Sequence, residues 1–134
     1  IPLDQFAANK YPNDILVRLI IKKHPQESVY LSHRNTKTDF PVLTCAVSVN
    51  AENGFVCIGA RPQKAVRLEL TEAVREKVWS GVCTEEEMKK EAECMASQVK
   101  TDSNMRAGKE YRSRLAYVLI RRALEALNTK GGDQ

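Results

Sequence analysis

The period of the apolar residues changes once along this chain, close to Thr71. Before this point, apolar side chains recur at about every second position, which is the period of a half-buried β-strand. The clearest run is 42–49, one face of which carries Leu43, Cys45, Val47 and Val49. After Thr71 the apolar positions recur every three or four residues, as on one face of an α-helix. Strands first and helices last predict an α+β fold, an antiparallel sheet of three to four strands packed against about three C-terminal helices.

Several segments between turn residues have the alternating, β-branched composition of strands. These are Ile15–Lys23, Val42–Val49 and Phe55–Gly59, with Val29–Ser32 as a shorter candidate. Ala65–Leu70 is either a fourth strand or an extended lead into a helix. The turn Asn50–Gly54 ends in Asn-Gly, and both Asn53 and Gly54 tolerate positive φ. We therefore expect a hairpin of segments 42–49 and 55–59.

Two helices are expected between Thr71 and Val99. The first has Leu70, Val74 and Val78 on one face and ends at Gly81. The second begins at Thr84, because Thr84 and Glu87 have the spacing of a capping box and Glu85 to Glu87 favour the positive end of the helix dipole. Its buried stripe is predicted to be Met88, Ala92, Met95, Ala96 and Val99.

The last helix is expected within residues 102–124. Its apolar stripe is predicted to be Tyr111, Leu115, Val118, Leu119 and Ala123. The arginines are expected mostly at the sides of that stripe, and they are Arg112, Arg114, Arg121 and Arg122. Residues 128–134 form a polar, glycine-rich tail that we expect to fray.

Length, charge and hydropathy exclude several classes of protein. The 134 residues suffice for one core, and the net charge of +4 is spread among acidic residues, which disfavours nucleic-acid binding. The longest apolar run, Ile15–Ile21, is interrupted by Arg18 and is too short to cross a bilayer. Because the chain begins at Ile1 without a methionine, we expect a soluble fragment of a longer polypeptide.

The four cysteines lack the spacing of a metal site or a redox pair. They are Cys45, Cys57, Cys83 and Cys94. No histidine stands close enough in sequence to complete a tetrahedral zinc site, and no signal peptide precedes them. We expect no metal ligands, reduced thiols that pack as small hydrophobic groups, and a cytoplasmic location.

No group of residues forms a self-sufficient active site, so no catalytic residue is predicted. His24 and His33 have no acidic partner at a fixed spacing and are expected at the surface. The glycines do not form a phosphate-binding loop. Trp79 is expected to anchor either the core or an interface. The polar stretch 30–40 is either a solvated connection or a contact to an anionic or heteroaromatic group.

The segment 102–124 also resembles a family signature. It reads D-x-x-x-R-x-x-x-E-Y-R-x-x-L-A-x-V-L-x-R-R-A-L, which is similar to the last helix of the FAD-binding (medium) subunit of molybdenum hydroxylases, the family of xanthine dehydrogenase and aerobic carbon monoxide dehydrogenase. Further segments resemble that subunit in the same order along the chain. They are Ile1–Phe6, Asp14–Ile21, Asp39–Val49 and Ile58–Arg67.

The resemblance implies a division of the chain. Residues 1–28 would be the end of a flavin-domain linker and a first strand, residues 29–127 the flavoprotein C-terminal domain, and residues 128–134 the frayed tail. FAD would be bound mostly by a preceding N-terminal FAD domain. An iron–sulfur subunit and a molybdopterin subunit would be the other partners, with a homodimer left open, and electrons would pass from molybdenum through iron–sulfur clusters to FAD.

The resemblance also implies site residues. In the family, the loop before the Asp39-like strand lies near the isoalloxazine and often carries a lysine followed by an Arg-Arg pair. This chain has Ser32, Asn35 and Thr36 at those positions, so the candidates for lining the cofactor edge are Arg34, Lys37, Asp39 and Phe40. Asp102, Tyr111 and Arg112 are expected to lock the start of the last helix. The alternative is a stand-alone interaction module that binds a protein through the helical face around Trp79.

Overall fold

The computed structural model describes residues 1–2, 5–6, 9–11 and 13–131. An antiparallel sheet in the order β1-β2-β3-β4 forms the first half of the domain. Its strands are β1 (Glu27–His33), β2 (Leu43–Val49), β3 (Gly54–Gly59) and β4 (Val66–Glu69). The helices that follow are α2 (Glu72–Trp79), α3 (Glu85–Gln98) and α4 (Lys109–Gly131). The predicted α+β fold is confirmed.

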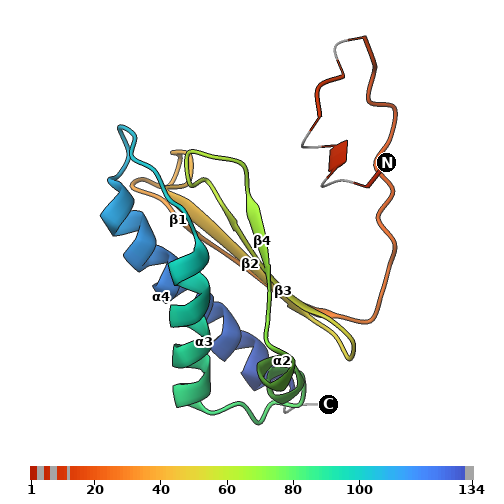
Figure 1. The fold of residues 1–134 in the computed structure, drawn as a ribbon, viewed down its shortest axis with the longest axis vertical. Helices are drawn as coiled ribbons and strands as arrows, with labels where there is room; N and C mark the ends of the chain where they lie inside the picture. Colours follow the sequence, from red (N-terminus) through yellow and green to blue (C-terminus); the bar gives the residue numbers. More distant parts are fainter. Residues whose placement is uncertain (3–4, 7–8, 12, 132–134) are drawn as a thin grey trace.

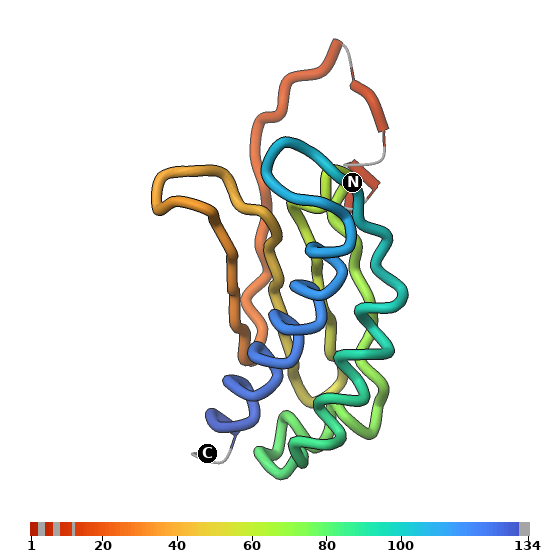
Figure 2. Tube along the Cα trace, turned by 90° about the vertical axis from the view of Figure 1, so that its left-hand side faces the viewer, coloured from red at the N-terminus to blue at the C-terminus, as the bar shows by residue number. Residues whose placement is uncertain are grey.

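The helices lie on one side of the sheet (Figure 1). Helix α4 packs on β1 and β2, and α3 runs beside α4, as Figure 2 also shows. The alternation predicted for residues 42–49 is confirmed, because Leu43, Cys45, Val47 and Val49 are all buried. Leu119, Ile120 and Leu124 of α4 are part of the same core. Within the described ranges, none of the helices has the length and apolar character to cross a membrane.

The hairpin between β2 and β3 exists, but its turn differs from the prediction. Neither Asn53 nor Gly54 has a positive φ. The Asn50 side-chain oxygen instead accepts hydrogen bonds from the backbone N–H groups of Glu52 and Asn53, at 2.8 and 2.7 Å. Gly54 is required for packing, since a Cβ there would lie 2.9 Å from Cδ1 of Leu70.

The strand predicted for Ile15–Lys23 is wrong. This segment is irregular, and Figure 1 shows it leaving the lower end of the sheet and running away from the helices. Six of its apolar side chains are between 58% and 88% exposed. A β-prone composition becomes a strand only when a neighbouring strand satisfies its backbone, and no described segment pairs with this one.

The first two helices follow their predicted signals. Gly81 has φ 71° after the end of α2, and the capping box of Thr84 and Glu87 is formed. The stripe of α3 is buried as predicted, apart from the half-buried Ala96. Trp79 is partly buried and packs against the core. Glu91 of α3, which the apolar pattern missed, is buried and accepts hydrogen bonds from Thr71.

The last helix begins later and ends later than predicted. It starts at Lys109, and residues 102–108 form a loop closed by a bridge between Asn104 and Ala107. It remains helical through Gly131, past the tail boundary expected at Asn128. Residues 132–134 of the predicted tail lie outside the described part of the chain, and so do Leu3 and Asp4 of the segment Ile1–Phe6. The buried face comprises Arg112, Leu115, Ala116, Leu119, Ile120, Ala123, Leu124 and Leu127.

Two residues of α4 therefore contradict the prediction, and Val118, which was predicted in the buried stripe, is only half-buried. Tyr111 is 49% exposed, and Arg112, expected at the side of the helix, is completely buried. The buried stripe follows 112, 115, 116, 119, 120. Tyr111 lies about 100° of rotation from Arg112, beyond the edge of this stripe. A pattern that treats every arginine as polar places the stripe incorrectly.

Candidate functional site

Two loops that are distant in sequence meet at the upper end of the sheet in Figure 1, and we call them the loop pair. The first, residues 34–41, joins β1 to β2, and the second, residues 102–108, joins α3 to α4. The Asn35 side chain donates a hydrogen bond to the backbone oxygen of Arg106 at 3.1 Å. All four predicted cofactor-edge residues lie in the first loop.

Asp39 and Arg106 form the charged centre of the loop pair. Nε of Arg106 lies 3.1 Å from Oδ1 of Asp39, and both side chains are a little over a quarter exposed. The same carboxylate oxygen accepts from the backbone N–H of Phe40 at 2.7 Å. Arg34 donates through Nη1 to the backbone oxygen of Asp39 at 2.9 Å. Two guanidinium groups thus converge on one aspartate, while Lys37 lies exposed in the same loop.

Two exposed apolar side chains, those of Phe40 and Met105, flank this charged centre. The Phe40 side chain is 75% exposed, and the guanidinium carbon of Arg106 lies 5.3 Å from its ring centroid. Met105, beside Arg106, is 94% exposed. A partly desolvated cation next to an exposed aromatic face suits a planar or anionic group.

A histidine and a tyrosine border the loop pair. His33, at the end of β1, and Tyr111, in the first turn of α4, place the ring Nε2 and the phenol oxygen 3.0 Å apart. This bond connects the sheet to α4 beside residue 34. The surface position predicted for His33 is only partly correct, since its side chain is half-buried.

The buried guanidinium of Arg112 supports the loop pair from below. Its Nε donates to the backbone oxygen of Val42 at 2.9 Å, and its Nη1 donates to those of Asp102 and Ala107 at 2.7 and 2.6 Å. Its Nη2 donates to the side-chain oxygen of Asn104 at 2.6 Å. The expected role of Arg112 in locking the helix start is confirmed.

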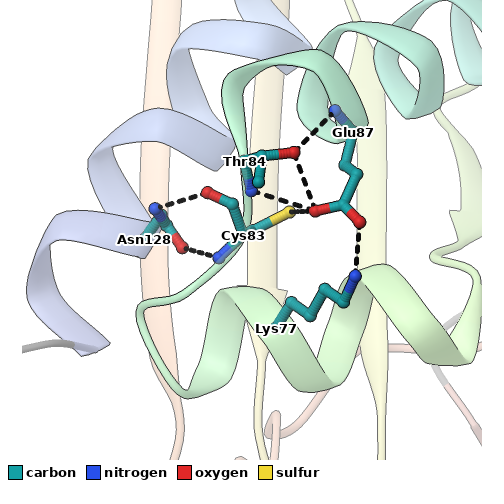
Figure 3. A network of polar contacts seen from close by, with 5 residues as sticks. All are labelled: Lys77, Cys83, Thr84, Glu87 and Asn128. Carbon is teal, nitrogen blue, oxygen red and sulfur yellow. Dashed lines mark hydrogen bonds and ion pairs between the residues drawn. The ribbon is translucent and has the colours of Figure 1, made fainter.

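A second polar cluster, the junction cluster, lies at the opposite end of the domain in Figure 1, where α2 and α3 meet the end of α4. Figure 3 shows it from close by. It comprises Lys77, Cys83, Thr84, Glu87 and Asn128. The hydrogen bond from Lys77 and the capping bonds from Thr84 lower the pKa of Glu87 to about 2. Burial, followed by the nearby Glu87 carboxylate, raises the pKa of the Cys83 thiol. A protonated thiol is a poor nucleophile, so we interpret this cluster as structural.

Burial also makes two of the other cysteines, Cys45 and Cys57, poor nucleophiles. All four are free, and burial raises the pKa of Cys45 to about 12. Burial also raises the pKa of Cys57, against the opposing effect of Arg67. In the part of the chain that the structure covers, no three histidine, cysteine or acidic side chains gather as a metal site would require.

The sequence comparisons decide the family. Residues 28–127 match the family model of the CO dehydrogenase flavoprotein C-terminal domain. The chain belongs to this family. It is therefore a domain of the flavoprotein subunit of molybdenum hydroxylases, and the resemblance noted in the sequence is confirmed. No curated protein matches the sequence.

A solved structure shares the fold of this flavoprotein domain. The chain is similar to quinoline 2-oxidoreductase from Pseudomonas putida 86, with a TM-score of 0.66 and 13% sequence identity. The match covers 81% of this chain and 39% of that chain. The flavoprotein domain thus spans about two fifths of the relative's length, and at this identity the likeness concerns the fold alone.

The loop pair of the flavoprotein domain contains one functional candidate that sequence reasoning missed. Arg106 was present in the D-x-x-x-R motif, but a helix starting at Asp102 would have placed it on a helix flank. The loop conformation of 102–108 instead directs it to Asp39, 67 residues away. Whether Arg34, Lys37, Asp39 and Phe40 line a cofactor stays a prediction.

Proposed function

We propose that this chain is the C-terminal domain of the FAD-binding subunit of a molybdopterin-dependent hydroxylase or dehydrogenase, and that its loop pair lines the edge of the flavin. The observation that carries the proposal is the exposed Phe40 ring beside the Asp39–Arg106 ion pair. An exposed ring provides a face for an isoalloxazine, and a guanidinium provides positive charge for its polar edge.

The charge of the loop pair supports an electron-rich ligand. It contains three cationic side chains, Arg34, Lys37 and Arg106, against the carboxylates of Asp39 and Asp102. FAD would accept electrons when it is bound. This chain would place positive charge near the isoalloxazine, and that charge favours reduced FAD by Coulomb attraction.

The residues present fit one edge of FAD and not the whole cofactor. The chain has no glycine-rich loop for a pyrophosphate, and the loop pair offers an exposed ring and cations on an open surface. The phosphates and most of the ring would therefore be held by a preceding N-terminal FAD domain.

The apolar segment 15–21 supports contact with such a domain. Ile15, Val17 and Ile21 are each more than 85% exposed. So many exposed apolar side chains in one short segment are unfavourable in water and are typical of a surface that another part of a protein covers. We assign that role to the FAD domain.

The wider assembly is part of the same proposal. The chain would support electron transfer from molybdenum through iron–sulfur clusters to FAD, in contact with an iron–sulfur subunit and a molybdopterin subunit. Four free cysteines agree with a reducing, cytoplasmic setting. Copurification of iron, molybdenum and FAD with the tagged intact flavoprotein would support this assembly, and recovery of FAD alone would contradict it.

The flavin contact is tested by substituting the loop pair in the intact, FAD-loaded flavoprotein. Arg106→Gln is expected to lower the midpoint potential of the flavin and Phe40→Ala to alter its absorption spectrum. Arg67→Gln is the matched control, because Arg67 also stacks on a phenylalanine, Phe55, at 3.6 Å but lies on β4. If the first two variants behave like Arg67→Gln, the loop pair does not contact the flavin.

A further inference from the structure

Arg112 is the largest fully buried side chain in the described part of the domain. Burial lowers its pKa, so the environment disfavours the charge. An apolar side chain of similar size would fill the same space without desolvating an ion, and such replacements are often neutral or stabilising. Packing alone therefore does not explain an arginine at this position.

The hydrogen bonds of Arg112 reach both members of the loop pair. Val42, whose backbone oxygen accepts from Nε, directly follows loop 34–41. Asp102 and Ala107, whose backbone oxygens accept from Nη1, stand at the two ends of loop 102–108. One rigid, planar group on the first turn of α4 thus fixes the ends of two loops to each other.

A short relay connects Arg112 to Arg106. Oδ1 of Asn104 accepts from Nη2 of Arg112 at 2.6 Å and from the backbone N–H of Arg106 at 2.9 Å. The side chain of Arg106 then reaches Asp39 at 3.1 Å, and Asp39 in turn fixes the backbone of Phe40. The positions of the Phe40 ring and the Arg106 guanidinium are thereby linked to Arg112, which touches neither of them.

We propose that Arg112 is a positioning residue of the candidate site, which holds Arg106 against Asp39 and keeps the Phe40 ring turned outward. The inference rests on the proposed function for what the loop pair contacts, but not for the coupling itself. Lysine cannot replace arginine here, because a single ammonium nitrogen cannot span Val42 and Asn104 as the guanidinium fork does.

The coupling is tested in the full chain by the hydrogen exchange of the Arg106 Nε–H, followed by NMR with labelled arginine. In Arg112→Lys this proton is expected to exchange about tenfold faster or more, because its bond to Asp39 is no longer held. Arg75→Lys is the matched control: Arg75 is also buried and also donates to backbone oxygens, at residues 50 and 51 at the other end of the sheet. It should leave the Arg106 proton unchanged.

A second variant covers the case in which Arg112→Lys does not fold. Asn104→Ala removes only the relay oxygen and leaves the three backbone bonds of Arg112 in place. It too should accelerate exchange at Arg106. Unchanged exchange at Arg106 in folded Arg112→Lys would overturn the inference, and so would unchanged exchange in Asn104→Ala if Arg112→Lys does not fold.

The flavin measurement separates this inference from the proposed function. In the intact FAD-loaded flavoprotein, Arg112→Lys should shift the midpoint potential in the same direction as Arg106→Gln, whereas Arg75→Lys should not. Faster exchange at Arg106 with an unchanged flavin potential in both Arg112→Lys and Arg106→Gln would support the positioning role and refute the flavin contact.

Discussion

Asn128, which the sequence assigned to a frayed tail, is expected to be a stabilising residue of the domain. Its side chain pairs with both backbone groups of Cys83: Oδ1 accepts from the Cys83 N–H at 2.9 Å, and Nδ2 donates to the Cys83 oxygen at 3.1 Å (Figure 3). The pair ties the end of α4 to the junction between α2 and α3. Asn128→Ala removes both bonds at once.

The expected loss can be estimated from these two bonds. Each contributes about 1 kcal/mol net, and leaving a nearly buried N–H without a partner adds about 1 kcal/mol or more. Cys83 is only 5% exposed, so water does not readily replace the lost partner. Alanine recovers about 0.5 kcal/mol through its higher helix propensity. The variant should therefore be destabilised by about 2.5 kcal/mol, which lowers the urea midpoint by roughly 1–2 M.

Urea unfolding followed by the fluorescence of Trp79, the single tryptophan, measures this loss. Thr129→Ala is the matched control, because among the residues that the structure describes the Thr129 hydroxyl bonds only to carbonyl oxygens of its own helix, those of Glu125 and Ala126. It should change the free energy of unfolding by less than about 0.5 kcal/mol. Equal midpoints for Asn128→Ala and the unmodified chain would mean that the two bonds to Cys83 do not stabilise the domain, as expected of a frayed tail.

Two further predictions concern packing and pH. Gly54→Ala should destabilise the domain by about 1–3 kcal/mol in the same unfolding assay, because the added Cβ would lie 2.9 Å from Leu70. Gly108→Ala is the control and should cause no such loss, because the nearest atom to its added Cβ lies at 3.6 Å. Equal losses in the two variants would contradict the packing argument. The pKa of Glu87 is lowered to about 2, chiefly by its hydrogen bond with Lys77. The ionised carboxylate therefore stabilises the fold fully above the ordinary glutamate pKa of about 4.3, and this stabilisation is lost as the pH falls towards 2. The stability difference between Glu87→Gln and the unmodified chain should therefore shrink between about pH 5 and pH 2 in urea titrations, and a constant difference would be inconsistent with the ion pair.

Local patterns explain why much of the fold was predictable. Alternation in 42–49 and the capping box at Thr84 depend on neighbours a few residues apart, and both are found in the structure. The segment 15–23 fails because a strand needs a partner that no pattern within the segment reveals. The predicted start of α4 is wrong because hydrogen bonds from the buried Arg112 hold residues 102–108 as a loop. A burial rule based on polarity treats arginine as exposed and therefore misses this contact.

The candidate site was only half predictable for a related reason. Loop 34–41 was identified through the family resemblance, which supplied Asp39 and Phe40. Arg106 lies 67 residues from Asp39, and its role depends on the tertiary contact between two loops. Sequence motifs indicated that Arg106 belongs to the family signature, while its partner became evident only with the fold.

The most direct test of the central claim is a photo-crosslink from Phe40 in the intact, FAD-loaded flavoprotein. Phe40 is replaced by p-benzoylphenylalanine, the sample is irradiated, and the products are identified by mass spectrometry. The same replacement at Phe55, on β3, is the control. We expect an adduct of FAD to the peptide containing residue 40 and none to that containing residue 55. Adducts from residue 40 to protein peptides alone would contradict the placement of the loop pair at the flavin edge.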